Sequence, residues 1–507
     1  MKINLIKNNK VKSATFNYIF SFSSFFFAIL TSLLLIPFYL QYISLSDYGA
    51  WIASSALVGM IGLLDPGIGT ILTQRLSVFY ELKDDKKFSD LFNASIFIGL
   101  GMFFVSTIIG LLLIELAMEV MKYSGEMSNG ISIGLIYVVL AVSITPLTTI
   151  VGSALRARHD TLYAGISQLI STLLAIIVLI TGFITGYGIA TLGFAIFIIT
   201  IANLLIQSFR LIASDGFKKI FQVLPRKELA IDIMKRSSYL YAPKGSSIVA
   251  NNLEVALIGA LISSEMSAVY ILSKKIFQLT TMLIDRIGTA VFAGISGIFS
   301  SNNKAQINSA LINILSMSIL IGSTGVAFTL GVGEQFIKIW IGESAYAGNL
   351  LFALIGLAVL FESRSILLRT LLIANNLVGQ VAIIQSLEIF LKIGVMWILI
   401  NSLGANAIPL ATIITALIVI LYFDNIILQK FEMTNIHTLY PGFIPMIINL
   451  LIGIIWMLFY KYSESLAFSI LEMLIFATIT LAVSLLSKSS RNLIKEIFIR
   501  FKSGLNK

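Results

Sequence analysis

The chain of 507 residues contains no cysteine and only two histidines, His159 and His437. The absence of cysteine excludes disulfides, thiolate metal sites and cysteine nucleophiles. Both histidines fall in short polar connections, so a histidine-based metal cluster or catalytic dyad is not expected. We therefore expect no metal, no cofactor and no catalytic residue, and a protein that is not an enzyme.

Charged residues are also scarce. They make up 12% of the chain and hydrophobic residues 57%, against about 25% charged and roughly 45–50% apolar residues in soluble domains. A soluble fold cannot bury this much apolar surface, and long apolar runs satisfy their backbone polar groups in a bilayer as helices. Strands of membrane barrels alternate apolar and polar residues, unlike these runs. The composition predicts an all-α polytopic membrane protein.

Apolar runs of about 20 residues, the length that crosses the hydrocarbon core, recur along the whole chain and predict about fourteen spans. The spans lie near residues 16–39, 47–74, 90–114, 131–154, 162–182, 188–211, 239–262, 267–296, 307–331, 348–373, 377–400, 406–428, 441–460 and 465–487. The first run follows a basic segment but is too long for the apolar part of a cleaved signal, so it is interpreted as a span. An even number of spans places both termini on one side.

The formal net charge of +10 comes mainly from lysines and arginines in alternate connections between the spans. The opposite connections hold only Lys122, Lys338 and Lys461. Because basic loops stay in the cytoplasm, both termini are predicted to be cytoplasmic. The charge also favours contact with anionic membrane lipid, whereas nucleic acid is not an expected partner because no soluble domain carries a basic patch.

A two-fold plan is indicated by the longest polar connection, residues 214–238, which divides the chain after six spans. The segment DPGIGT at 65–70 aligns with IDRIGT at 284–289 in the second half. Two such lobes, related by an axis along the membrane normal, would enclose a cleft and could rock to give alternating access. We expect an N-terminal six-helix lobe, a pseudo-symmetric C-terminal six-helix lobe, and two additional helices with a basic cytoplasmic tail, over residues 1–220, 221–435 and 436–507.

Ionisable residues inside spans are costly unless they face a polar cavity or a partner, so each one predicts a functional site. Away from the span ends, cations occur only in the second half of the chain. The candidates for a cationic substrate-binding cavity are Lys244, Lys274, Lys275, Arg286, Arg364 and Lys392. Lys274 and Asp285 share one face of their helix, although internal ion pairs and snorkelling lysines offer a structural alternative.

Uncharged polar and acidic residues accompany these cations. The polar cavity candidates are Asn251, Gln278, Asp285 and Gln385, and the candidates for coupling to an ion are Asp65, Glu254, Glu362 and Glu388. Asp65 precedes Pro66 and Gly67, where a broken helix would expose backbone groups, but an acid at this position can equally cap a helix. Glu388 and Lys392 stand one turn apart and could neutralise each other.

The first two spans carry three motifs, PFYL at 37–40, SDYGAW at 46–51 and GLLDPGIG at 62–69. With the arrangement of six, six and two spans, these motifs resemble the polysaccharide transporters of the Wzx type. That family belongs to the multidrug/oligosaccharidyl-lipid/polysaccharide flippase superfamily. The resemblance covers the whole chain in architecture, and its local motifs cover only the first two spans.

Membership of that family would imply a V-shaped pair of lobes that moves an undecaprenyl-pyrophosphate-linked oligosaccharide, a precursor of O antigen, capsule or exopolysaccharide. The implied site of action is the bacterial cytoplasmic membrane, with polysaccharide polymerase machinery as a partner and H⁺ or Na⁺ as candidate coupling ions for a monomer. The cations of the second half would offset the pyrophosphate charge.

Two relatives in the same superfamily remain as alternatives, together with a receptor-like scaffold, which buried charges disfavour. A multidrug exporter of cationic compounds would be expected to line its cleft with acids. A lipid II flippase would be expected to carry arginines in the first lobe, where this chain has none inside the spans.

Overall fold

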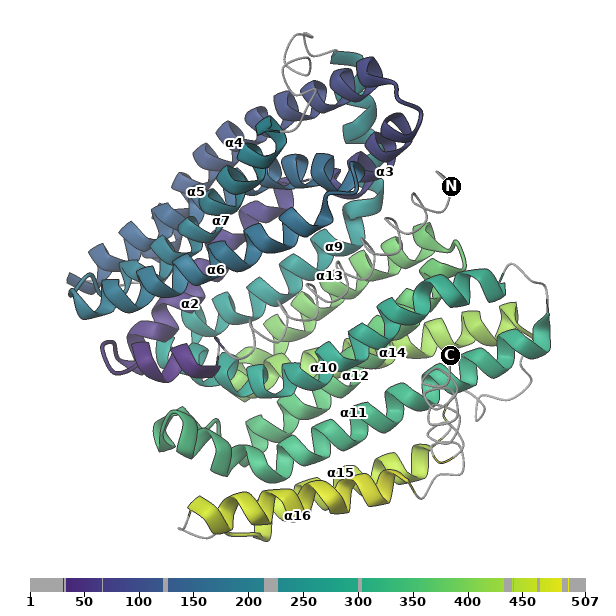
Figure 1. Cartoon of the computed structure of the whole chain (residues 1–507). Helices are drawn as coiled ribbons and strands as arrows, with labels where there is room; N and C mark the ends of the chain where they lie inside the picture. Colours follow the sequence, from purple (N-terminus) through teal and green to yellow (C-terminus); the bar gives the residue numbers. More distant parts are fainter. Residues whose placement is uncertain are drawn as a thin grey trace. The chain divides into compact units, whose positions relative to one another are not determined.

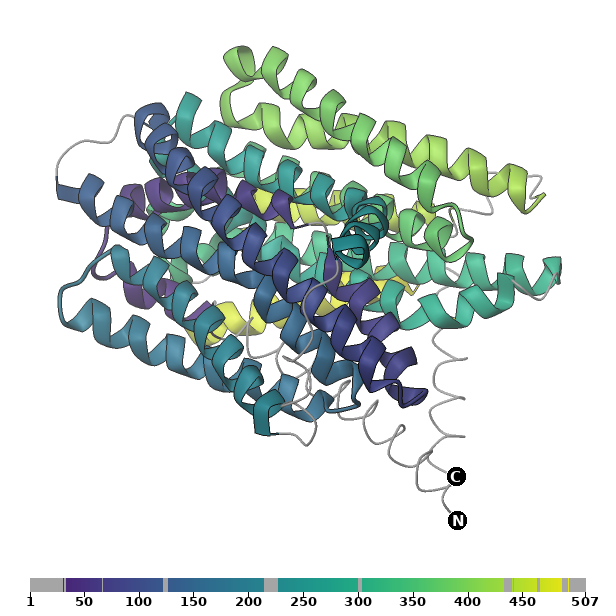
Figure 2. The ribbon, with the colours of Figure 1, turned by 90° about the horizontal axis from the view of Figure 1, so that it is seen from above.

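The computed structural model describes most of the helical part of the chain. The described residues are 31, 33–65, 67–121, 126–213, 227–299, 303–432, 440, 442–462, 466–485 and 491. They form helices and short connections, and no strand occurs among them (Figure 1, Figure 2). The predicted all-α fold is confirmed.

Contacts divide the chain into two compact units, Met1–Ala268 and Val269–Lys507. The first unit contains α2 (Leu45–Gly59), the 3-10 helix η1 (Met60–Leu64), α3 (Ile68–Glu81), α4 (Asp85–Met121), α5 (Glu126–Ala157), α6 (Thr161–Ile184), α7 (Ala190–Ala213), α9 (Lys227–Leu261) and the first residues of α10 (Ser264–Phe299). The second contains the rest of α10, then α11 (Lys304–Trp340), η2 (Glu343–Ala345), α12 (Asn349–Ala374), α13 (Val378–Leu403), η3 (Gly404–Asn406), α14 (Ala407–Lys430), α15 (Phe443–Phe459) and α16 (Leu466–Ser484).

The helices follow the expected spans closely. Each span after the first coincides with one helix, except that α2, η1 and α3 share the second; most of the first span lies outside the described residues. Eight helical stretches in the described part are long and apolar enough to cross a membrane, and the longest of them, Val378–Lys430, includes both α13 and α14. The protein is therefore a multi-pass membrane protein.

The limits of the two six-helix lobes stay a prediction, but the packing of α9 bears on them. The span near 239–262 was expected to open the second lobe, whereas α9 packs in the first unit against α2, α3 and α4. Helix α10 then runs across the division between the units at Ala268. In terms of contacts, the first unit thus extends one helix beyond residue 220.

Small residues bring the helices of the first unit close together. Helix α5 packs against α3, α4 and α7, and at the crossing with α7 a side-chain carbon on Gly193 would stand only 2.0 Å from the carbonyl oxygen of Gly134. Lipid tails are as apolar as leucine, so helices in a membrane associate mainly through such close backbone packing. The glycine pair fixes how α5 and α7 cross.

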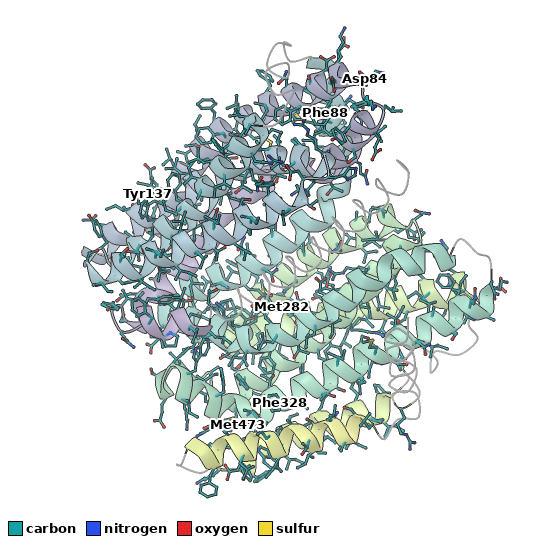
Figure 3. The ribbon with its side chains drawn as sticks, in the orientation of Figure 1. Asp84, Phe88, Tyr137, Met282, Phe328 and Met473 are labelled. Carbon is teal, nitrogen blue, oxygen red and sulfur yellow. The ribbon has the colours of Figure 1, made fainter. Side chains whose placement is uncertain are left out.

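Local sequence signals set the ends of several helices. Asp84 precedes α4 and accepts a hydrogen bond from the backbone N–H of Lys87 at 3.0 Å, near Phe88 at the same end of the helix (Figure 3). The Lys87 ammonium lies 2.8 Å from the Asp84 carboxylate. These hydrogen bonds from Lys87 lower the pKa of Asp84 below its usual value. An ionised acid at a helix start stabilises the first turn.

The two C-terminal helices, α15 and α16, pack against the rest of the second unit mainly through α11 (Figure 1). Asn449 of α15 donates a hydrogen bond of 2.5 Å to Ser484 of α16, and Ser484 also contacts Thr324 of α11. A side-chain carbon on Gly453 would lie 2.8 Å from the carbonyl oxygen of Ala327, so the α15 and α11 backbones nearly touch. These contacts hold α15 beside the helices that form the cavity described below.

Replacing Gly193 by leucine should separate α5 from α7, because the new side chain would overlap the Gly134 carbonyl. The expected cost is about 1–3 kcal/mol, as for other overpacked sites, seen as a lower thermal unfolding temperature in detergent. The matched control is Gly101→Leu on α4, where no atom lies within 4 Å of the added carbon. Equal unfolding temperatures for the two variants would contradict this account of the crossing.

Candidate functional site

A cluster of buried charges lies between α12 and α13. The Nη2 atom of Arg369 is 2.6 Å from Oε2 of Glu388, and each side chain is only 13% exposed. Arg369 also donates to the Ser365 hydroxyl at 2.8 Å. Lys392 and Glu362 lie close enough to Glu388 to interact with it electrostatically. The cluster therefore contains two bases and two acids, and its charges balance.

Four residues predicted from sequence, Glu362, Gln385, Glu388 and Lys392, belong to this region of α12 and α13. Gln385 is buried and stands one turn before Glu388 on the same face of α13. The structure adds the partner that the helical spacing could not supply, because Glu388 forms its ion pair with Arg369 of the neighbouring helix. Arg369, which was not among the residues predicted from sequence, is thus mostly covered and engaged in an ion pair.

A second polar group lies on another face of α12. Arg364 is 9% exposed, and its Nη2 atom lies 3.7 Å from Oδ1 of Asp424 on α14, which is completely buried. The Tyr440 hydroxyl donates a hydrogen bond to Oδ2 of Asp424. The guanidinium carbon of Arg364 stands 5.0 Å from the centre of the Tyr440 ring, in position for a cation–π contact. We call these three residues the Arg364 triad.

The Arg364 triad borders a cavity of about 990 Å³ within the second unit, at the upper end of the range for ligand sites of roughly 300–1,000 Å³. Residues from α10, α11, α12, α14 and the start of α15, together with the chain just before α15, form its wall. The polar side chains in that wall are Ser318, Arg364 and Tyr440. The remainder are the apolar residues Ile284, Ile319, Leu360, Phe361, Leu417, Ile420, Leu421, Gly442, Phe443, Ile444, Pro445, Met446 and Ile448.

Helix α12 keeps these two polar groups apart. At 100° per residue, Arg364 points about 140° away from Arg369 and about 160° away from Glu362, whereas Arg369 and Glu362 are only about 20° apart. Helix α12 accordingly packs against both α13 and α14. The three charges that the sequence places in one short stretch serve two different sites.

The polar residues of α10 are spread along the helix. Lys274 is buried, Lys275 and Gln278 are half-buried and Asp285 is exposed. Eleven residues of helix extend about 16 Å, so Lys274 and Asp285 cannot neutralise each other directly. Nearby on α10, Met282 is exposed (Figure 3). The side chains of Lys244 and Arg286, also predicted from sequence, are not among those that the structure describes.

The candidates of the first unit lie at different places. Helix α2 passes through η1 and stops at Asp65, whose Oδ1 accepts a hydrogen bond of 2.9 Å from the backbone N–H of Gly67. Gly67 has a φ of +71°, a conformation that glycine adopts without strain. The predicted break in the second span is present. Gly67 is the N-cap of α3, without a side-chain cap hydrogen bond, so the Asp65 contact is local to the break, and both readings of Asp65 stay predictions. On α9, Glu254 is fully buried and Asn251 is exposed.

Polar side chains on α6 and α7 are engaged with one another. The Ser167 hydroxyl donates to Asn203 at 2.7 Å, and the Gln207 amide donates to Ser167 at 3.1 Å. Arg210 lies 2.7 Å from Asp160. These groups bind the two helices together, since a hydrogen bond to a neighbouring helix satisfies a polar group in the membrane.

Two members of the Arg364 triad, Asp424 and Tyr440, were missed in the sequence. Asp424 falls within the expected span 406–428, so the rule that flags ionisable residues in apolar runs applies to it directly. Tyr440 stands just before the next span, where an aromatic residue is usually an interface anchor. Only the three-dimensional arrangement shows that its hydroxyl reaches Asp424.

No protein-family model and no curated protein sequence matches the chain. Solved structures do match. The lipid II flippase MurJ in an inward closed conformation has a TM-score of 0.69 at 15% identity, over 94% of this chain and 100% of that one. A multidrug resistance MATE family transporter of the MOP superfamily, facing inward, has a TM-score of 0.64 at 14% identity, over 80% and 99%. The eukaryotic MATE transporter AtDTX14 has a TM-score of 0.56 at 13% identity, over 86% and 97%. The chain therefore has the fold of these transporters.

Removing Glu388 alone should destabilise the second unit, because it leaves Arg369 buried without its partner. Glu388→Gln is expected to cost roughly 3–5 kcal/mol, and much of this should return in the double variant Arg369→Gln/Glu388→Gln. Thermal unfolding in detergent measures both. The control is the exposed pair Lys304–Glu432 at 2.6 Å, where Glu432→Gln should change stability by less than about 1 kcal/mol. A double variant no more stable than Glu388→Gln would contradict the pairing.

Proposed function

We propose that the protein is a flippase that moves an undecaprenyl-pyrophosphate-linked oligosaccharide repeat unit across the bacterial cytoplasmic membrane. The observation that carries the proposal is the apolar cavity with Arg364 in its wall. A substrate of this class joins a long isoprenoid chain to an anionic pyrophosphate, so its site must offer apolar surface beside a cation. Arginine suits the second requirement because its planar guanidinium donates two parallel hydrogen bonds to a phosphate.

The proposal assigns the other cations predicted from sequence to the same path. Lys274 and Lys275 on α10 and Lys392 on α13 would meet the remaining negative charge of the headgroup, together with Lys244 and Arg286. Buried cations are expensive in a bilayer unless a partner or a polar path compensates them. The apolar wall of the cavity would receive the isoprenoid units next to the pyrophosphate while the rest of that chain stays in lipid.

Transport would proceed by alternating access, with both termini in the cytoplasm as the distribution of basic loops indicates. The shared fold with MATE transporters and MurJ supports movement of a substrate rather than its chemical conversion. Asp65, Glu254, Glu362 and Glu388 remain candidates for coupling the transport to H⁺ or Na⁺. The glycan would be a precursor of O antigen, capsule or exopolysaccharide, which the polymerase machinery then extends.

A multidrug exporter is the second candidate. The pairing of charges in the structure makes this candidate stronger than it was from the sequence alone. Arg364 and Arg369 both face acids, Asp424 and Glu388, so the second unit is less positive than a count of its bases implies. An apolar cavity also suits amphiphilic drugs. Expression in a pump-deficient host should then raise resistance to cationic dyes, whereas the flippase proposal predicts no change.

A lipid II flippase is the third candidate because the structure of MurJ matches 94% of the chain. Growth of a strain depleted of its own lipid II flippase distinguishes this activity directly. Rescue of that strain would assign the chain to the same role, and the proposal of a polysaccharide precursor predicts no rescue.

The proposal predicts that cations of the second unit are required for surface glycan. In the native host, Arg364→Gln and the triple variant Lys274→Ala/Lys275→Ala/Arg286→Ala should each lower surface glycan at least about tenfold, because an unpaired pyrophosphate in the membrane loses more than 1.4 kcal/mol of stabilisation. The glycan of each variant is compared per amount of protein in the membrane, because Arg364→Gln leaves the buried Asp424 without its cation and should lower the abundance of that variant. The control is Lys304→Gln, an exposed lysine of the same unit. Normal glycan with the triple variant would overturn the proposal.

A further inference from the structure

The ion pair between Arg364 and Asp424 is longer than the one between Arg369 and Glu388. The Nη2 atom of Arg364 and Oδ1 of Asp424 are 3.7 Å apart, beyond the usual hydrogen-bond range of about 2.7–3.2 Å, whereas Arg369 and Glu388 meet at 2.6 Å. Asp424 is nevertheless the more deeply buried acid, and its Oδ1 accepts no hydrogen bond from the described residues. Asp424 therefore neutralises Arg364 without being fully satisfied by it.

Arg364 touches both that carboxylate and the cavity. The arginine and Tyr440 form part of the cavity wall, whereas Asp424 is not part of the wall and contacts both of them. An anionic group inside the cavity and the Asp424 carboxylate would consequently compete for one guanidinium. Two anions cannot share a single cation in the membrane interior without a large electrostatic cost, so one of the two charges must be removed.

We propose that the Arg364 triad is a proton-for-anion exchange site. The phosphate group of an isoprenoid ligand in the cavity replaces Asp424 on Arg364, and the released carboxylate binds one proton from water. An O–H bond forms on Asp424, the ligand keeps its negative charge, and the total charge of the site is unchanged. This inference rests on the proposed function, for which it names the residue that links transport to protons.

Tyr440 suits such an exchange because a phenolic hydroxyl can both donate and accept a hydrogen bond. It donates to the Asp424 carboxylate in the present state. After protonation it can accept from the new carboxylic acid, so Asp424 keeps a partner in both forms. Tyr440 is thus assigned as the residue that positions Asp424.

Among the described residues, Arg364 and Tyr440 are the groups that act on the charge of Asp424. Helix α12 contributes Arg364, the chain before α15 contributes Tyr440, and α11 contributes the uncharged Ser318 to the adjoining wall. The charged side chains of α13 belong to the Arg369–Glu388 cluster, on the other side of α12. On α10, Asp285 is exposed.

The sign of the pH dependence follows from the exchange. Because the ligand-bound state holds one more proton than the free state, binding should strengthen as the pH falls. Above the pH range in which Asp424 is protonated in the ligand-free chain, the affinity should weaken by up to about tenfold for each pH unit. An anionic ligand that bound without exchange would show no such slope.

The test uses the full chain in discs of zwitterionic lipid and two matched probes. Farnesyl methyl phosphate is a diester whose single charge does not titrate between about pH 5 and 9, and farnesol is its neutral counterpart. Binding is measured by native mass spectrometry, and proton uptake by an indicator dye in weak buffer. The phosphate probe should take up close to one proton per molecule bound, and farnesol none.

The variants separate the roles within the triad. Asp424→Asn should bind the phosphate probe without proton uptake, with an affinity that no longer depends on pH and is at least tenfold higher than that of the original chain at high pH. Arg364→Gln should lose the preference for the phosphate probe over farnesol, and Arg364→Lys, which keeps the charge, should retain part of it. The control is Glu343→Gln, an exposed acid of the same unit, which should behave like the original chain.

Binding of the phosphate probe without proton uptake, or a pH dependence that persists in Asp424→Asn, would overturn the exchange. Failure of the original chain to bind the phosphate probe would overturn it as well. None of these results decides the proposed function, which rests separately on the surface glycan of the Arg364 and α10 variants. If the Arg364 and α10 variants lose surface glycan but the original chain takes up no proton on binding the phosphate probe, the flippase proposal stands and Asp424 is not its coupling residue.

Discussion

An ionised side chain in the hydrocarbon interior is stable only beside a partner, and the second unit is organised by this constraint. Two arginines of α12 each face an acid on a different helix, Arg369 with Glu388 on α13 and Arg364 with Asp424 on α14. Losing one member of such a pair leaves a charge that no solvent can stabilise. The ion pairs therefore fix which faces of α12 meet α13 and α14, in a region where apolar packing alone would allow many arrangements.

The same constraint separates structure from function on one helix. The Arg369–Glu388 pair is short, and the charges of its neighbours Lys392 and Glu362 balance each other. Such a neutral group is expected to hold two helices together. The Arg364 triad is looser and borders a large apolar cavity. A cation whose acid partner lies at 3.7 Å, next to space for a ligand, is the more favourable place for an anion to bind.

The sequence predicts the helices far better than their partners. Apolar run length marked nearly every helix, because the thickness of a bilayer sets that length, and the Asp-Pro-Gly stretch at residue 65 marked the break between α2 and α3. Helical spacing offered Lys392 as one partner for Glu388, whereas the ion pair at 2.6 Å is with Arg369 on another helix. Asp424 lies in an apolar run and could have been found from the sequence, but its partners could not, since spacing along one helix carries no information about which helix or loop lies beside it. Tyr440 was missed for that reason.

The central claim is that Arg364 serves the passage of an anionic lipid-linked glycan from one leaflet to the other. It is tested most directly by reconstituting the purified chain in liposomes that carry an undecaprenyl-pyrophosphate-linked sugar, and measuring how much sugar becomes accessible to an external lectin over time. The account predicts transfer between leaflets with the original chain, and transfer no faster than in protein-free liposomes with Arg364→Gln. Equal rates for the original chain and protein-free liposomes, or for the original chain and the variant, would contradict it.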